Sequence, residues 1–259
     1  MLKAYGPSCA TSRSFRRLLG LTVFAGLFCL LAPFCDLSGA TSAQCTDAAN
    51  WQKRAEIAEA SLKDWARLGF YRKANAQLPY PATGQRVVFM GDSILGFWNP
   101  PPLEKPYMNR AIAGQSTAQM LVRFRADVVA LKPKVVVMMG GTNDLRWSVQ
   151  EVETVKDNLS SMSEIARANG IRVVLGSLPP PAQASDEALI RATQKLNTWV
   201  SDYSSRNGDY FADFYSVLVS EKGGFKPELT SDGLHPNAKG YQTMAPLLRS
   251  AVGQALREP

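Results

Sequence analysis

Short apolar runs alternate with longer amphipathic stretches over most of this 259-residue chain, beginning near Arg86. Four apolar runs, rich in β-branched or aromatic residues, have the length of buried strands: 87–90, 135–139, 171–175 and 210–213. Apolar residues recur at helical spacing between and after them, over 117–131, 149–169, 186–206 and 238–256. This alternation predicts βαβ units, so we expect an α/β fold with a parallel sheet covered by helices on both faces.

The first 43 residues have a different pattern. Three arginines at 13, 16 and 17 precede an apolar run over 18–35, and small residues follow up to position 43. This layout is typical of a secretory signal peptide that is cleaved near Ala40 or Ala43. The apolar run is also long enough for the alternative, an uncleaved membrane anchor. We therefore expect an exported protein, periplasmic or extracellular, or one tethered to the membrane by residues 18–35.

Residues 44–84 are predicted to form a helical extension and linker ahead of a main domain over 85–259. Apolar positions recur at three- and four-residue steps between Thr46 and Leu78, which favours an amphipathic helix that packs on that domain: Ala55, Ala58, Leu62, Trp65 and Leu68. Gly69 can end or bend this helix, and the Pro- and Gly-containing segment 79–84 interrupts any continuation.

Charge and cysteine content narrow the function classes. The chain carries a net charge of +7, of which residues 1–40 contribute +3, and the remainder has no basic block. We therefore expect no nucleic-acid partner. Three of the four cysteines precede residue 36, so a cleaved chain keeps only Cys45 and can form no internal disulfide. With one cysteine and one histidine, a zinc site of the usual type is not expected, and we predict no metal and no cofactor.

The only histidine, His235, follows Asp232 in a Gly- and Pro-containing segment, 231–236. A carboxylate three residues before a histidine can turn back to one ring nitrogen and leave the other free to take a proton. The alternative is a structural histidine in a loop or in the core. A nucleophile is available at Ser93, in Gly91-Asp92-Ser93-Ile94 at the end of the first predicted strand, although Asp and Ser are also common helix caps.

Two further segments carry groups that could stabilise an oxyanion. Gly114, in the segment 109–117 that leads into a predicted helix, can bring a backbone N–H close to a ligand because it has no Cβ. Gly140-Gly141-Thr142-Asn143-Asp144 follows the second strand and can place the amide of Asn143 over the same edge of the sheet. Each segment is also an ordinary turn sequence.

Together, and in this order, the four segments resemble the blocks of the SGNH hydrolases, the GDSL-type esterase and lipase superfamily. The resemblance extends over about 86–252. The sequences around Gly114, over 123–133 and around Gly141 are similar to those of the bacterial branch related to platelet-activating-factor acetylhydrolase. It implies a three-layer α/β/α sandwich with a flavodoxin-like sheet. It also implies that Ser93 is the nucleophile, His235 the base and Asp232 the residue that orients it. The oxyanion hole would comprise the N–H groups of Ser93 and Gly114 and the side chain of Asn143.

The sequence departs from many relatives after Ser93, where Leu95-Gly96-Phe97-Trp98 replaces a polar Thr-Asp. Phe97, Trp98 and Trp147 are therefore candidates to line a substrate pocket, with core or loop packing as the alternative. We expect a serine esterase that hydrolyses carboxylic esters, with short acyl chains, through an acyl-enzyme. The alternatives are a polysaccharide O-acetylesterase, a lysophospholipase or thioesterase, and a binding protein without turnover.

Overall fold

The computed structural model describes residues 42–79, 85–98, 101–103, 106–148, 151–181 and 186–257. Nearly all of the predicted signal peptide, with the apolar run 18–35, lies outside these residues. Within the described part of the chain, no helix is both long and apolar enough to cross a membrane. The chain divides into two units, residues 1–51 and 52–259, and helix α1 spans Ser42–Lys63.

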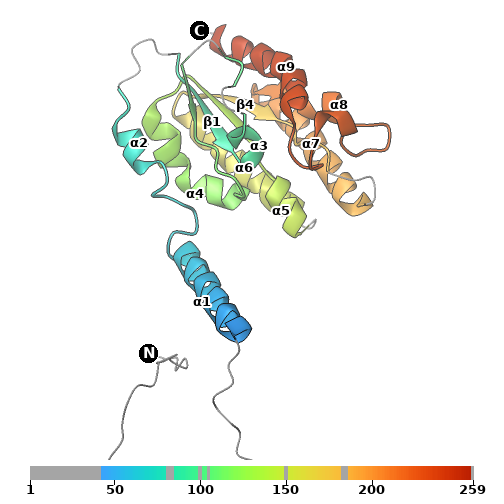
Figure 1. Cartoon of the computed structure of the whole chain (residues 1–259). Coiled ribbons are helices and arrows are strands. Elements are labelled where there is room, and N and C mark those ends of the chain that lie inside the picture. The colour runs from blue at the N-terminus through green and yellow to red at the C-terminus, as the bar shows by residue number, and fades with distance from the viewer. Residues whose placement is uncertain are drawn as a thin grey trace, which may run out of the picture. The chain divides into compact units, whose positions relative to one another are not determined.

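A parallel sheet forms the centre of the second unit (Figure 1). It has five strands in the order β2-β1-β3-β4-β5. The strands are β1 (Val87–Gly91), β2 (Tyr107–Asn109), β3 (Val135–Met139), β4 (Arg172–Gly176) and β5 (Tyr210–Ala212). Every residue of β1 and β3 is buried, as expected for central strands covered on both faces. The predicted α/β fold is confirmed, and β2 is a strand that the sequence pattern did not reveal.

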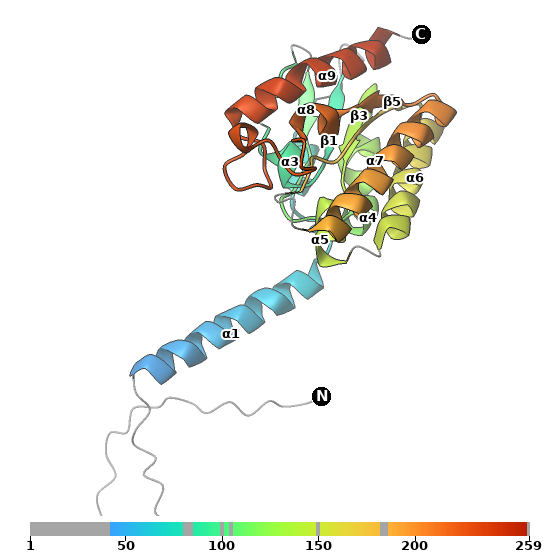
Figure 2. The same ribbon diagram turned by 90° about the vertical axis from the view of Figure 1, so that its right-hand side faces the viewer.

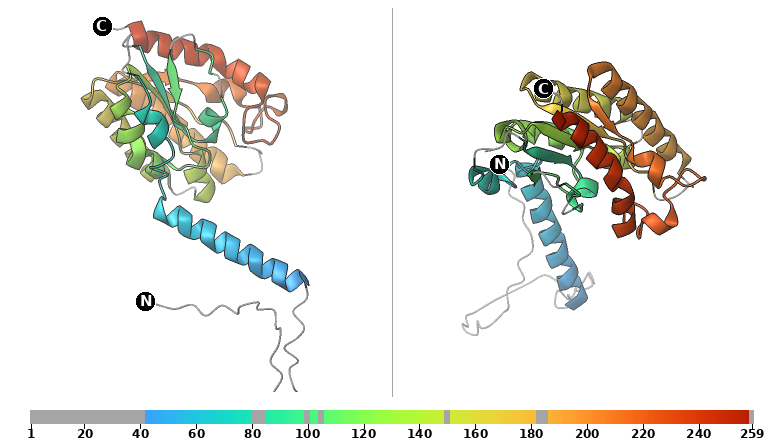
Figure 3. Two further views of the ribbon diagram at one scale, coloured as in Figure 1. Left: turned by 60° about the vertical axis from the view of Figure 1, so that its left-hand side comes forward. Right: turned by 90° about the horizontal axis from the view of Figure 1, so that it is seen from above.

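Helices pack on both faces of this sheet. Helices α4, α6 and α7 cover one face, and α9 crosses the other, with α8 beside it (Figures 2 and 3). Their bounds are α3 (Ser93–Gly96), α4 (Thr117–Asp127), α5 (Thr142–Trp147), α6 (Val152–Ala168), α7 (Glu187–Asn207), α8 (Phe214–Leu218) and α9 (Ala238–Arg257). Short 3₁₀ turns add η1 (Val129–Leu131) and η3 (Pro227–Leu229).

The first helix of the extension ends before Gly69, the residue expected to end or bend it. Helix α1 ends at Lys63, and a separate short helix, α2, spans Arg72–Ala76. The Asp64 carboxylate accepts hydrogen bonds from the backbone N–H groups of Leu68 (2.7 Å) and Gly69 (3.1 Å), which stabilises a turn in place of further helix. Leu62, Trp65 and Leu68, expected on a buried stripe, are exposed.

Close contact between β1 and β3 requires a residue without a side chain at the end of β1. Gly91 lies opposite Met139, and a Cβ at Gly91 would lie 2.7 Å from the Met139 carbonyl oxygen and 2.8 Å from Leu95 Cδ1. A backbone atom cannot move aside as a flexible side chain can. The strand therefore has no room for alanine here.

We predict that Gly91→Ala lowers the free energy of unfolding by about 1–3 kcal/mol, the usual effect of overpacking. Gly96→Ala is the matched control: its Cβ would make an ordinary contact, 3.8 Å from Ala111 Cβ, within helix α3. That variant should be as stable as the parent or slightly more stable, because alanine favours helix. Urea unfolding followed by circular dichroism measures both. Equal stability of the two variants would contradict the steric argument.

Candidate active site

Ser93 lies where β1 turns directly into helix α3. The Asp92 side chain caps this helix by accepting a hydrogen bond from the Ile94 N–H (2.9 Å). Ser93 is the first residue of this one-turn helix and follows the end of β1 by two residues. It therefore lies at the carboxyl edge of the sheet, where sites form in parallel α/β folds. Ser93 is half-buried and therefore open to solvent on one side.

The structure brings His235 and Asp232 to this serine. Ser93 Oγ lies 2.8 Å from His235 Nε2, and His235 Nδ1 lies 2.6 Å from Asp232 Oδ2. The other carboxylate oxygen, Oδ1, accepts the N–H groups of His235 (2.8 Å) and Leu234 (2.9 Å). The hydrogen bond from the His235 ring and these two N–H groups hold the pKa of Asp232 well below its usual range. Asp232 thus stays ionised, which favours the proton on Nδ1 and leaves Nε2 free to accept one from Ser93.

The loop that carries His235 is fixed by neighbours that the sequence analysis did not single out. The Thr230 hydroxyl donates to the His235 carbonyl (2.7 Å) and accepts the Gly233 N–H (2.9 Å), while Gly233 takes a left-handed φ of 76°. The Tyr241 hydroxyl donates to the carbonyl of Ile94 (2.8 Å), so it ties α9 to the residue after Ser93. Burial raises the pKa of Tyr241, which keeps this donor protonated. No local motif marks Thr230 or Tyr241.

Asp92, the residue before Ser93, has surroundings opposite to those of Asp232. Its side chain is fully buried, and burial raises its pKa to about 6. One oxygen accepts the Ile94 N–H, and the other has no hydrogen-bond partner among the described residues. The Thr142 hydroxyl lies near enough to lower the pKa in part, but the two groups do not reach hydrogen-bond geometry.

The two predicted oxyanion segments meet at the same edge of the sheet. The segment with Gly114 is drawn to the end of β1 by a hydrogen bond from the Ile112 N–H to the Gly91 carbonyl (3.0 Å). Gly114 is exposed and has a φ of 80°, a conformation that favours glycine. Asn143 follows β3, the neighbour of β1, and its Nδ2 donates to the Gln115 carbonyl (2.9 Å). One N–H of this amide is therefore engaged, and the second is available to a ligand.

The three candidate pocket residues differ in exposure. Phe97 is 56% exposed, and its ring centroid lies 5.0 Å from that of the His235 imidazole. Trp147, at the end of α5, is 69% exposed. Trp98 is only 5% exposed and packs against Phe214 and Tyr241, so the structure corrects its assignment as a pocket residue: it belongs to the core. No cluster of three or more potential metal ligands occurs within the described ranges.

Comparisons with known proteins find several solved structures with a similar fold. Among solved structures, a proposed acylhydrolase from Bacteroides fragilis NCTC 9343 is 36% identical with a TM-score of 0.68, over 74% of this chain and 99% of that chain. A GDSL-like lipase from Bacteroides thetaiotaomicron VPI-5482 is 35% identical with a TM-score of 0.67, over 73% and 98%. A proposed platelet activating factor from Streptococcus pneumoniae is 25% identical with a TM-score of 0.60, over 76% and 99%.

No curated protein matches the chain. Residues 89–243, more than half of the chain, match the GDSL-like Lipase/Acylhydrolase family, and this range contains Ser93, Asn143 and His235. The chain therefore belongs to the GDSL-like lipase/acylhydrolase family, a family of carboxylic ester hydrolases.

Proposed function

We propose that the protein hydrolyses short-chain carboxylic esters through an acyl-enzyme on Ser93. The observation that carries this proposal is the continuous hydrogen-bonded series Ser93–His235–Asp232, with separations of 2.8 and 2.6 Å. Ser93 Oγ attacks the ester carbonyl carbon while His235 Nε2 takes the hydroxyl proton. The ionised Asp232 holds the ring in place and stabilises the imidazolium that forms.

Collapse of the tetrahedral intermediate completes the first half of the reaction. The imidazolium of His235 gives its proton to the departing alkoxide, and the acyl group stays on Ser93. Water then enters, His235 takes a proton from it, and the same steps in reverse release the acid and restore the serine. In both halves, the N–H groups of Ser93 and Gly114 and the free N–H of Asn143 are the donors to the oxyanion.

The surroundings of Ser93 support a small acyl group. Ile94, Leu95 and Trp98 follow Ser93 in the chain but are buried in the core, so they offer no open apolar surface to a long acyl chain. The exposed rings of Phe97 and Trp147 favour a second candidate, the removal of O-acetyl groups from a polysaccharide, because an open edge with aromatic faces can accept a polymer. The export predicted from residues 1–43 supports such an extracytoplasmic substrate.

A panel of p-nitrophenyl esters of increasing chain length, run beside acetylated polysaccharides, tests the substrate class. Fastest turnover of acetate or butyrate esters supports the proposal, and deacetylation of the polymer at a comparable rate supports the second candidate. Fastest turnover of long-chain esters or lysolipids would contradict both.

Ser93→Ala and His235→Ala should each abolish p-nitrophenyl acetate turnover while leaving the circular dichroism spectrum unchanged, because the three residues act as one unit. A serine-directed fluorophosphonate should label the parent protein but not Ser93→Ala. His235 is the only histidine in the chain, so no other imidazole can replace it. Parent-like activity in His235→Ala would overturn the mechanism.

Asn143→Ala should lower kcat by about 10²–10³, the usual effect of losing one oxyanion donor. The matched control is Asn169→Ala, which removes an exposed amide that donates to the Ile165 carbonyl at the end of α6. Steady-state kinetics on p-nitrophenyl acetate compare the two variants. A kcat for Asn143→Ala within a few-fold of the control would exclude Asn143 from the oxyanion hole.

Asp92→Asn should stabilise the protein in a pH-dependent way. The pKa of Asp92 is about 6 when folded against 3.8 for the unfolded chain, so stability is lost as pH rises through this window and the carboxylate ionises. An amide keeps the cap on Ile94 without the charge, so the variant should gain up to about 3 kcal/mol over the parent at pH 7.5 and little at pH 4. Urea unfolding at both pH values, with the half-buried α8 cap variant Asp213→Asn as control, measures the difference. An equal effect at both pH values would contradict it.

A further inference from the structure

The segment with Gly114 is held from outside the site by the helical extension. We call residues 111–116 the oxyanion loop and residues 65–75 the brace. The Tyr71 hydroxyl of the brace donates to the Ala111 carbonyl (2.8 Å), at one end of the loop. Near the other end, Gln115 Nε2 donates to the Ala66 carbonyl (3.0 Å). Gly114 lies between these two attachments and has no side chain of its own to fix it.

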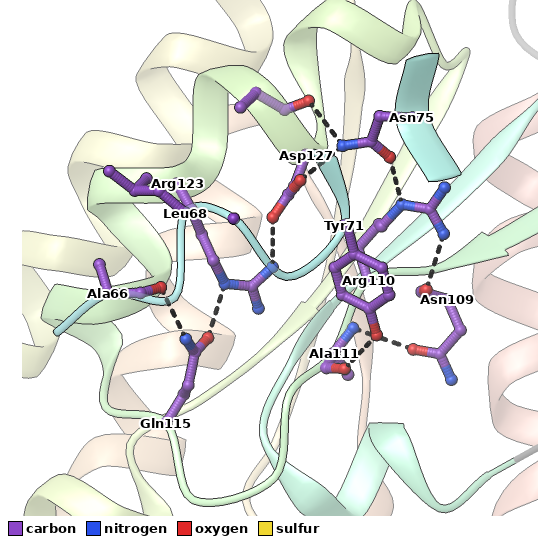
Figure 4. Close-up of polar contacts among 12 residues, drawn as sticks. Ala66, Leu68, Tyr71, Asn75, Asn109, Arg110, Ala111, Gln115, Arg123 and Asp127 are labelled. Atoms are coloured by element: carbon purple, nitrogen blue, oxygen red, sulfur yellow. Dashed lines mark hydrogen bonds and ion pairs between the residues drawn. The ribbon is translucent and has the colours of Figure 1, made fainter. Parts of the chain in front are cut away.

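The brace is itself held by a buried polar network on α4 (Figure 4). Arg123 and Asp127 pair at 2.9 Å, with side chains 0% and 2% exposed. Asn75 of the brace donates from Nδ2 to Asp127 Oδ1 (2.6 Å) and accepts on Oδ1 from Arg110 Nε (2.8 Å). The Arg110 guanidinium carbon lies 4.7 Å from the centre of the Tyr71 ring. This network fixes both the side chain of Tyr71 and the helix that bears Asn75.

Gln115 connects the brace to the active site because three of its groups are engaged at once. Its Nε2 bonds to the brace, its Oε1 accepts from Arg123 Nε (2.6 Å), and its backbone carbonyl accepts from Asn143 Nδ2 (2.9 Å). The side chain is 2% exposed. A shift of Gln115 therefore moves the anchor of Asn143 and the position of the Gly114 N–H together.

We propose that Tyr71 and Gln115 are positioning residues, through which the brace holds the Gly114 N–H and the Asn143 amide in place for the oxyanion. The inference deepens the proposed function and rests on it. It gives residues 65–75, which lie outside the matched family range 89–243, a role in positioning the oxyanion donors of the active site. Oxyanion donors are effective when they are held in place before the reaction. An enzyme whose oxyanion loop is released at either end should therefore have a lower kcat, with little change in its affinity for the ester.

Two conservative variants test the brace. Tyr71→Phe removes only the hydroxyl that holds Ala111, and Gln115→Met removes both side-chain hydrogen bonds at similar volume. Each should lower kcat by about five- to thirtyfold, a part of the 10²–10³ that one oxyanion donor contributes, and should change KM by less than about twofold. Tyr203→Phe is the matched control, because it removes a half-buried hydroxyl between α7 and the Ser160 carbonyl of α6, away from the loop. It should leave kcat unchanged.

A double-mutant cycle with Asn143→Ala separates positioning from general destabilisation. If the brace acts through the oxyanion donors, the kcat loss caused by Gln115→Met should shrink at least about threefold when Asn143 is already alanine. An undiminished, multiplicative loss would overturn the proposal. So would an equal kcat loss in Tyr203→Phe.

Hydrogen exchange tests the brace without any substrate. The backbone amides of 111–116 should exchange faster in Tyr71→Phe than in the parent protein, and at the parent rate in Tyr203→Phe. Unchanged exchange in Tyr71→Phe would overturn the inference even if the enzyme is active. A parent protein that hydrolyses no ester would instead overturn the proposed function, and the exchange rates would still decide whether the brace fixes the loop.

Discussion

The parallel pairing of β1 with β3 brings the reacting groups to one place. Gly91 lies opposite Met139, and the two strands end at the same edge of the sheet. Ser93 follows one strand and Asn143 the other, so the proposed nucleophile and a proposed oxyanion donor lie at the same edge of the sheet. Gly91 is also the point to which the oxyanion loop is attached, through its carbonyl and the Ile112 N–H. The close approach of the two backbones at Gly91 therefore sets the position of the oxyanion loop relative to Ser93 and Asn143.

Two carboxylates flank Ser93, and their surroundings give them opposite properties. Asp232 is exposed, yet three hydrogen-bond donors, two on His235 and one on Leu234, lower its pKa. Its carboxylate is therefore ionised over the pH range in which an imidazole titrates. Burial raises the pKa of Asp92, one of whose oxygens has no hydrogen-bond partner among the residues that the structure describes. At pH 6 about half of the Asp92 carboxyls are neutral, whereas Asp232 is ionised, so below pH 6 the negative charge lies mainly on the imidazole side of the serine. The carboxylate that contacts the His235 ring is therefore the one that stays ionised over the wider pH range, and it can stabilise positive charge on that ring.

Four of the five strands, β1, β3, β4 and β5, could be predicted from the sequence, and the edge strand β2 could not. The apolar runs 87–90 and 135–139 identify β1 and β3, because burial on both faces leaves no polar position within them. Tyr107-Met108-Asn109 forms only three residues of edge strand, half-buried, and shows no such run. Ser93, Asn143, Asp232 and His235 were singled out because each lies in a short segment with a chemical signature. Tyr71 was not, because its partner is the backbone carbonyl of Ala111, and a main-chain acceptor leaves no trace in the sequence.

The buried pair on α4 is hard to explain by stability alone. Arg123 and Asp127 stand four residues apart, a spacing at which such pairs are usually exposed, yet both are buried. Removing two charges from water costs several kcal/mol per ion, and Arg123 Nη2 has no partner in the described part of the chain, so apolar residues of similar volume would stabilise α4 as well or better. What apolar residues cannot do is direct hydrogen bonds. Arg123 orients Gln115, and Asp127 orients Asn75, each with fixed geometry. The pair is thus better explained by the precision that it imposes on the brace and the oxyanion loop than by any contribution to folding.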